Sequence, residues 1–191
     1  MADVDPFLFD RAKRGDRDAF WKLVMPYRGL IYSVAFGMLK DHDRAEDQLH
    51  DVLLTALRSL WNLRDPSRLP SWLYSMTRNR VIDQARREKR LRHALKASAP
   101  EIARVVPISE LQEKEAWLRR METALAGLPE PFRVILGMKY TNDYSCRDIA
   151  EILDISIPAV KSRLFEARKL LRKRTEALQA LEETSIKDQS S

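Results

Sequence analysis

The sequence predicts an all-α protein of two small helical domains joined by an extended linker. Only five glycines occur in 191 residues, and Ala, Leu, Arg, Glu and Lys are abundant, which favours helices. Apolar residues recur at helical spacing up to about position 92 and again from position 111. Between them, prolines at 100 and 107 interrupt the pattern. We therefore expect a first domain at 1–92, a linker at 93–110, a second domain at 111–178 and a tail at 179–191.

The first domain is predicted to contain a series of helices with tight connections. A short helix begins at Pro6 and ends before Gly15. The next apolar pattern covers 17–40, where Pro26 should break or kink the helix, and a third begins near Asp43 and ends near position 60. The turn chemistry of 63–70 predicts a loop. We expect Ser71 to cap the helix that leads into the basic cluster at 86–96.

The second domain contains the pattern of a helix-turn-helix. In the segment 145–156, SCRDIAEILDIS, Ser145 precedes an apolar face and Asp148 follows it by three residues, which predicts a capped helix start. After a turn of three residues, Ser156 can cap a second helix that has Pro158 in its first turn. The inward stripe of this second helix is expected to be Val160, Leu164, Ala167 and Leu171.

The outward face of that second helix suits a DNA major groove. Near its N-terminal half we expect base-reading side chains, namely Lys161, Ser162, Phe165 and Glu166. The remaining cations suit phosphates, above all Arg163 and Arg168. The alternative from the pattern alone is an amphipathic helix with a solvated charged face.

Charge and composition narrow the classes of function. The net charge of +6 is concentrated in two patches, since 86–96 has six basic residues and 161–174 has seven, each with one acid. Polyanions are therefore the expected partners. The single Cys146 allows no internal disulfide, and no Cys/His spacing fits a structural zinc. Signal peptide, membrane span, phosphate loop and catalytic motif are not found, so we expect a cytoplasmic protein that is no enzyme and needs neither metal nor cofactor.

Two groups of segments resemble bacterial sigma factors of the sigma-70 family. The segments 45–51 (AEDQLHD), 64–69 (RDPSRL) and 72–79 (WLYSMTRN), with Asp83 and the pair at 86–87, are similar to the second conserved region of that family. The segments 128–133 (LPEPFR) and 161–168 are similar to its fourth region. Because further domains of primary sigma factors are missing, the chain resembles the compact extracytoplasmic-function (ECF) group. The resemblance covers positions from about 8 to 175.

The resemblance implies a factor that binds core RNA polymerase and directs it to promoters. The helix at 45–60 would dock on the clamp of the largest polymerase subunit through Asp47, His50 and Asp51, and the second domain would meet the flap. In relatives the positions of His50 and Asp51 usually carry Gln and Glu.

The resemblance also assigns two DNA-reading surfaces. The −10 element, where a base leaves the stack, would be read by Asn79 with Arg64, Asp65 and Ser67, because an amide and a loop pocket can hold an extruded base. The cations expected to hold the backbone there are Arg78, Arg80, Arg86 and Arg87. The −35 element would be read by Lys161, Ser162, Arg163, Phe165, Glu166 and Arg168. Trp72 and Tyr74 are expected to pack in the core.

The resemblance further implies that an anti-sigma factor binds this protein. It also implies that the protein does not insert into a membrane and that it associates with the nucleoid when it is active. Two other functions fit parts of the sequence. A helix-turn-helix regulator acting alone would share the second domain but leave 45–87 without a role. A sigma-like protein that binds polymerase or an inhibitor without starting transcription is the third possibility.

Overall fold

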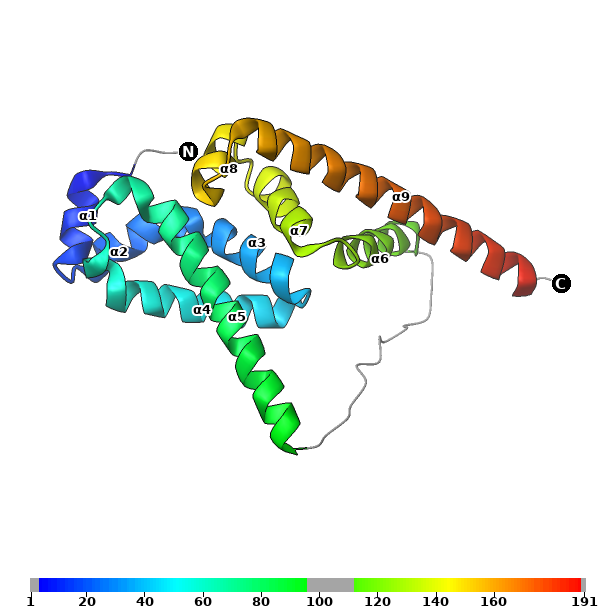
Figure 1. Cartoon of the computed structure of the whole chain (residues 1–191), viewed down its shortest axis with the longest axis horizontal. Helices are drawn as coiled ribbons and strands as arrows, with labels where there is room; N and C mark the ends of the chain where they lie inside the picture. Colours follow the sequence, from blue (N-terminus) through cyan, green and yellow to red (C-terminus); the bar gives the residue numbers. More distant parts are fainter. Residues whose placement is uncertain (1–3, 96–111, 190–191) are drawn as a thin grey trace.

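The computed structural model describes residues 4–95 and 112–189, and within these ranges every regular element is a helix (Figure 1). The elements of the N-terminal module are α1 (Pro6–Lys13), α2 (Arg17–Val24), the 3-10 turn η1 (Met25–Tyr27), α3 (Arg28–Leu39), α4 (His42–Ser59), the 3-10 turns η2 (Leu60–Asn62) and η3 (Pro66–Arg68), and α5 (Leu69–Leu95). Those of the C-terminal module are α6 (Gln112–Ala126), α7 (Glu130–Leu136), the π-helical turn η4 (Gly137–Thr141), α8 (Cys146–Leu153) and α9 (Ile157–Gln189). The predicted all-α class is confirmed for the described residues.

The helix boundaries of the N-terminal module follow local chemistry. Gly15 has φ +93°, a conformation that glycine adopts without a Cβ penalty, and Asp16 then caps α2 by accepting from the Ala19 amide at 3.0 Å. Pro26 lies in η1, so the pattern predicted over 17–40 is two helices joined by a tight turn. Asp41, just before the acidic start that the sequence suggested, caps α4 through the Arg44 amide.

The expected cap at Ser71 is wrong. Helix α5 already begins at Leu69, because Asp65 caps η3 through the Ser67 amide and η3 continues directly into α5. Ser71 lies inside the first turn, where its hydroxyl donates to the Arg68 carbonyl.

The helix-turn-helix has the predicted capping. Ser145 and Asp148 form a reciprocal capping box: the Ser145 hydroxyl accepts from the Asp148 amide at 3.1 Å, and the Asp148 carboxylate accepts from the Ser145 amide at 2.9 Å. Helix α8 ends with Asp154 in the left-handed region, at φ 52°. Ser156 then caps α9, accepting from the Ala159 amide at 3.3 Å. The caps, and the turn of three residues between the helices, are therefore confirmed.

The two long helices exceed the lengths that periodicity suggested. Helix α5 continues to Leu95, past the start of the linker proposed at 93–110, and residues 96–111 lie outside the described ranges. Helix α9 continues to Gln189, so the boundary proposed after 178 falls inside a helix. Figure 1 shows α9 extending from the body of the molecule toward the C-terminus.

Two large hydrophobic clusters form the core, and the second one joins the modules. The first lies within the N-terminal module, around α1, α2, α4 and the start of α5. The second contains the apolar faces of α7, α8 and α9, together with Leu30 and Val34 from α3, both fully buried. Helix α3 packs on α7 and η4, and α5 packs on α8. The modules are therefore in direct contact.

Candidate nucleic-acid and polymerase interface

The outward face of α9 presents the side chains that the helix-turn-helix pattern predicts for base contact. Val160, Leu164 and Ala167 are buried, which turns the opposite face of the helix to solvent. All six predicted −35 residues are exposed on it, namely Lys161, Ser162, Arg163, Phe165, Glu166 and Arg168. Phe165 keeps 60% of its surface exposed. A large apolar ring held in solvent between cations is well placed to contact a thymine methyl or a base edge.

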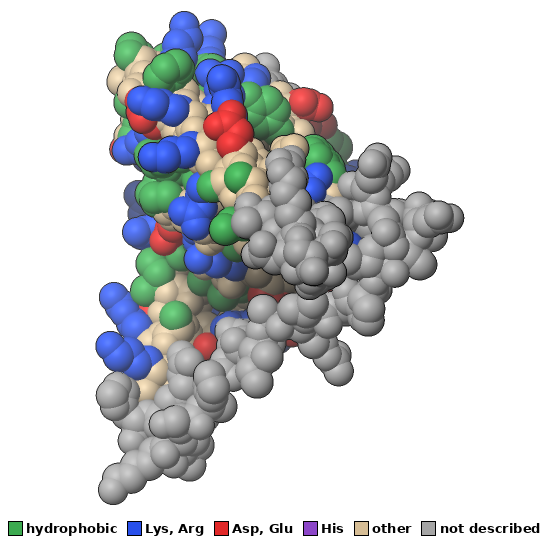
Figure 2. Space-filling view, turned by 90° about the vertical axis from the view of Figure 1, so that its right-hand side faces the viewer, with side chains coloured by type: hydrophobic (Ala, Val, Ile, Leu, Met, Phe, Trp, Pro, Cys, Tyr) green, Lys and Arg blue, Asp and Glu red, His purple; other side chains and the backbone are tan. Residues whose placement is uncertain are grey.

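Two further contacts shape this surface. The guanidinium of Arg168 donates from Nε to the Leu164 carbonyl at 3.1 Å and approaches the Tyr140 hydroxyl at 3.5 Å. Tyr140 is itself 58% exposed at the end of η4. Tyr140 carries no signal in the sequence, because no periodic pattern marks a residue in a π-helical turn. Figure 2 shows Lys and Arg side chains gathered toward the upper part of one face, with acidic side chains between them.

Helix α5 carries the cationic and amide side chains predicted for the −10 element. Asn79, Arg78, Arg86 and Arg87 are exposed, and Arg86 pairs with Asp83 one turn earlier at 3.6 Å. Arg80 differs, since it is half-buried and its Nη2 lies 3.2 Å from Asp51 Oδ2 on α4. This ion pair connects Asp51, which is expected to contact polymerase, with Arg80, which is expected to contact DNA.

The loop before α5 is organised around Asp65. Its Oδ1 accepts from the Ser67 hydroxyl at 2.7 Å and from the Ser67 amide at 2.9 Å. The Ser67 hydroxyl and amide hold the pKa of the Asp65 carboxyl below its usual value. Arg64, Asp65 and Ser67 are all exposed. Asp65 thus fixes the backbone of the loop, while Arg64 and the far side of the loop remain accessible.

A polar groove of about 550 Å³ lies between α4 and α5. It is lined by the three predicted polymerase contacts and by residues of α5: Asp47, Gln48, His50, Asp51, Arg80, Asp83, Gln84 and Arg87. The sequence predicts that Asp47, His50 and Asp51 share one helix, but it does not predict the groove, because the second wall comes from a helix more than 25 positions later.

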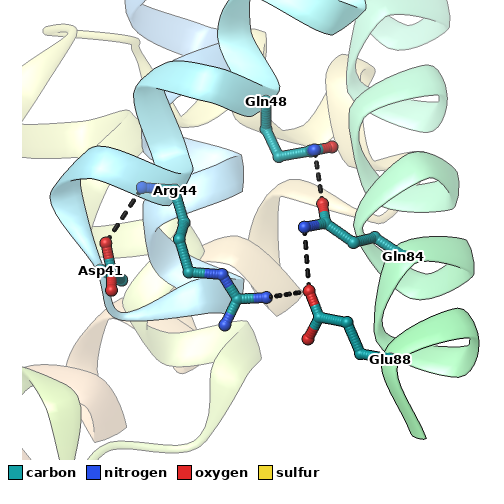
Figure 3. A network of polar contacts seen from close by, with 5 residues as sticks. All are labelled: Asp41, Arg44, Gln48, Gln84 and Glu88. Carbon is teal, nitrogen blue, oxygen red and sulfur yellow. Dashed lines mark hydrogen bonds and ion pairs between the residues drawn. The ribbon is translucent and has the colours of Figure 1, made fainter. Parts of the chain in front are cut away.

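One end of the groove is held by a hydrogen-bonded network between the two helices (Figure 3). Gln48 Nε2 donates to Gln84 Oε1 at 2.6 Å, and Gln84 Nε2 donates to Glu88 Oε1 at 2.9 Å. Arg44 also donates to Glu88 Oε1, at 2.7 Å. Because the network fixes the register of α5 against α4, it sets where the exposed cations of α5 lie relative to Asp47 and Asp51.

Among residues 4–95 and 112–189, no group of three His, Cys, Asp or Glu is arranged to hold a metal ion. His42 stacks on Phe36, with ring centroids 4.4 Å apart, and its Nδ1 lies 2.6 Å from the Tyr32 hydroxyl. In the part of the chain with described coordinates, no helix has the length and apolarity to cross a membrane.

Comparison with known proteins identifies the class. The sigma-70 region 2 family matches residues 23–91, and the sigma-70 region 4 family matches residues 118–171. The chain is 27% identical over 173 residues to the ECF RNA polymerase sigma factor SigW of Bacillus subtilis, covering 85% of this chain and 92% of that protein. It is 29% identical over 196 residues to the RNA polymerase sigma-H factor of Pseudomonas aeruginosa, covering 94% and 96%. The chain therefore belongs to the sigma-70 family, and within it to the ECF group.

Solved structures agree in fold. CnrH in complex with the cytosolic domain of CnrY superimposes with a TM-score of 0.64 at 22% identity, covering 92% of this chain and 99% of that one. The sigma factor RpoE of Bartonella quintana, in complex with the anti-sigma factor NepR, gives 0.61 at 24% identity, covering 84% and 98%.

Membership in this family defines the general function. The protein is an alternative sigma factor, which binds core RNA polymerase and directs promoter-specific initiation of transcription. Sigma factors are initiation factors that act on DNA in the cytoplasm and are not known as enzymes. A stand-alone helix-turn-helix regulator is not favoured, because the region 2 match accounts for the N-terminal module.

Proposed function

We propose that three separate surfaces of this chain bind core RNA polymerase, the −10 element and the −35 element. The α4 side of the groove contacts the polymerase clamp through Asp47, His50 and Asp51. Helix α5 and the loop before it contact the −10 element through Arg64, Asp65, Ser67, Arg78, Asn79, Arg80, Arg86 and Arg87. Helix α9 contacts the −35 element through Lys161, Ser162, Arg163, Phe165, Glu166 and Arg168. The proposal assigns the first two surfaces to a domain at 1–92 and the third to a domain at 111–178.

One observation carries the proposal: every side chain in these three sets is exposed, except Arg80, which is half-buried against Asp51. Folding does not use these polar and charged groups for the core, so they are available for partners. For Phe165 the argument is strongest, because a Phe that is 60% exposed leaves apolar surface in water that binding can cover.

At the −10 element, Asn79 is the group that accounts for base capture. It is exposed on α5, one helical turn from Asp83, and its amide both donates and accepts. An extruded base regains through such hydrogen bonds part of the stacking free energy that it loses. Arg78, Arg86 and Arg87 add exposed positive charge on the same helix for the phosphates.

At the polymerase surface, the Asp51–Arg80 pair suggests that the two binding events are linked. When polymerase engages Asp51, the Arg80 guanidinium loses its carboxylate partner and becomes available for a phosphate. The pair is partly exposed, so exchanging its partners costs little free energy.

We also propose that an anti-sigma protein controls this chain. The two solved relatives described above are each bound to such a regulator or to a cytosolic domain of a partner protein. The chain itself acts without enzymatic activity, and it associates with the nucleoid when it is bound to polymerase.

Charge reversal at Asp47 tests the polymerase surface. Asp47→Lys should weaken competition with a reference sigma factor for core polymerase by at least about tenfold, because it places a cation where an acid is expected to pair. Asp10→Lys is the matched control, since Asp10 is an exposed acid on α1, away from the groove. Equal competition by both variants, with promoter-directed transcription intact, would remove Asp47 from the interface.

A further inference from the structure

Glu166 is the only acidic residue in the cationic segment 161–174, which contains seven Lys and Arg residues. Its side chain is exposed on α9, whose opposite face is buried through Val160, Leu164 and Ala167. A surface that serves only to attract phosphates is weakened by a negative charge, because a carboxylate repels the DNA backbone. The contact that Glu166 makes in a DNA complex is therefore expected to be with a base rather than with a phosphate.

Glu166 lies in a small patch on the outward face of α9. Residues three, four and seven positions apart are neighbours on a helix surface, which places four exposed side chains together, namely Ser162, Phe165, Glu166 and Lys169. The patch combines a hydroxyl, an apolar ring, a carboxylate and an ammonium group. Base edges in the major groove offer the matching acceptors, donors and methyl groups. The setting of Glu166 is thus suited to base contact.

The Glu166 carboxylate forms no ion pair within the part of the chain that the structure describes. Arg163 and Lys169 are three positions away on either side, a spacing at which ion pairs commonly form on a helix. Such a pair does form on α8, where Arg147 Nε donates to Glu151 at 3.2 Å. The Glu166 oxygens therefore remain available as acceptors for a group outside the chain.

The major groove offers a carboxylate only two kinds of donor, cytosine N4 and adenine N6. Guanine N7 and O6 and thymine O4 are acceptors, and they repel an anion. Adenine has the N7 acceptor beside its N6 donor, so a carboxylate there meets repulsion as well as attraction. Cytosine presents its amine without an acceptor on its own major-groove edge, and Glu is a known partner of cytosine N4. Cytosine is therefore the base that fits Glu166 best.

We propose that Glu166 reads a cytosine in the −35 element by accepting a hydrogen bond from the N4 amine. The proposal rests on the proposed contact of α9 with the −35 element. The negative charge adds specificity, because its repulsion of the phosphates is offset only where the right base supplies a donor. Thymine places an acceptor where cytosine has its donor, so this replacement should weaken binding about tenfold.

Base preference in the holoenzyme tests this assignment. Promoters with randomised −35 elements are selected with reconstituted holoenzyme containing either the wild-type chain or Glu166→Gln. Because a Gln amide pairs with adenine N6 and N7, the variant should change the preferred base from cytosine to adenine at one position and leave the others unchanged. Glu176→Gln is the matched control, since Glu176 is exposed on the same helix but lies about 15 Å further along it. The control should keep the wild-type preferences.

A cytosine analogue tests the hydrogen bond itself. The analogue is 2-pyrimidinone, which has no exocyclic amine, and it replaces the selected cytosine in the −35 duplex. It should weaken binding of the wild-type holoenzyme about tenfold and should cause no comparable loss for Glu166→Ala, because both changes remove the same contact. The weaker pairing of the analogue with guanine affects both proteins alike, so it cancels in this comparison.

Three results would overturn the proposal. These are equal losses with the analogue for wild type and Glu166→Ala, identical base preferences for wild type and Glu166→Gln, and a wild-type preference for a base other than cytosine at the position that Glu166→Gln changes. A wild-type holoenzyme without preference at any −35 position would have a different meaning, because it would contradict the proposed contact of α9 with the −35 element.

Discussion

Arg133 and Gly37 are 96 positions apart in the chain, and the buried guanidinium of Arg133 donates to the Gly37 carbonyl at 2.5 Å. Burial lowers the pKa of this guanidinium, while Glu130 nearby raises it. Since Gly37 lacks a Cβ, the carbonyl and α7 come close enough for this bond. One contact therefore combines a packing requirement with a polar one, and it joins the two conserved regions of the sigma factor.

Replacing Arg133 with Leu should lower the free energy of unfolding by about 2 kcal/mol, because the Gly37 and Leu128 carbonyls lose their common donor. The measurement is urea unfolding followed by circular dichroism. Arg147→Leu is the control: its pair with Glu151 is exposed, and we expect a change within about 0.5 kcal/mol. Equal effects of the two variants would contradict the structural role of Arg133.

Loss of the capping box should weaken the helix-turn-helix specifically. Ser145→Ala removes the acceptor for the Asp148 amide, and we expect a loss of about 1 kcal/mol in stability. Ser145→Thr keeps a hydroxyl, so this variant should retain most of the wild-type stability. Thermal unfolding of the three proteins decides the matter, and a Thr variant as unstable as the Ala variant would argue against capping as the cause.

Stability should decline at alkaline pH because of Tyr144. Burial raises the pKa of its phenol to about 12, above the ordinary value of 10.0, with smaller contributions from Tyr27 and Asp148. The folded state therefore keeps this proton longer than the unfolded state does. The contribution of the protonated Tyr144 phenol to the free energy of unfolding is fully present below pH 10. This contribution is lost as the pH rises toward about 12. Urea unfolding across this window should show a smaller decline for Tyr144→Phe, and an unchanged decline would assign the effect to other groups.

The sequence predicted the helices, most of their caps and the exposure of the side chains proposed to contact DNA better than the way in which the modules meet. Apolar periodicity over 17–40 predicted helices with a buried face, but periodicity does not say which helix covers Leu30 and Val34 on that face. Gly29 and Gly37 share one face of α3, but the sequence does not show what meets that face, because the close approach depends on residues about 100 positions later. The cap at Ser71 was misplaced for a similar reason, because Asp65 and η3 begin the structure earlier.

Substitutions of Lys161 and Arg168 should change binding to the −35 element in two different ways. Lys161→Ala is expected to change the ranking of −35 sequences, since Lys161 is exposed near the start of α9, in the part of the helix that we propose contacts base edges. Arg168→Ala should weaken all sequences about equally and reduce the slope of log affinity against log salt by roughly 1. Titrations against a set of −35 variants at several salt concentrations separate the two effects. A uniform loss for Lys161→Ala would remove it from the base-reading set.

Asn79→Ala should weaken binding to a forked −10 probe by about 1–3 kcal/mol, with a smaller effect on the intact duplex, because only the fork presents an extruded base. Ser75→Ala is the control, since Ser75 is exposed one turn earlier on α5. Equal losses on fork and duplex would assign Asn79 to backbone contact instead.

Photocrosslinking in the promoter complex tests the central claim of two separate DNA-reading surfaces most directly. A photoreactive phenylalanine replaces Phe165 in one protein and Asn79 in another, and each is assembled with core polymerase on the selected promoter. We predict that position 165 crosslinks to the −35 element and position 79 to the non-template strand of the −10 element. Crosslinks from both positions to the same element, or from neither to DNA, would contradict the account.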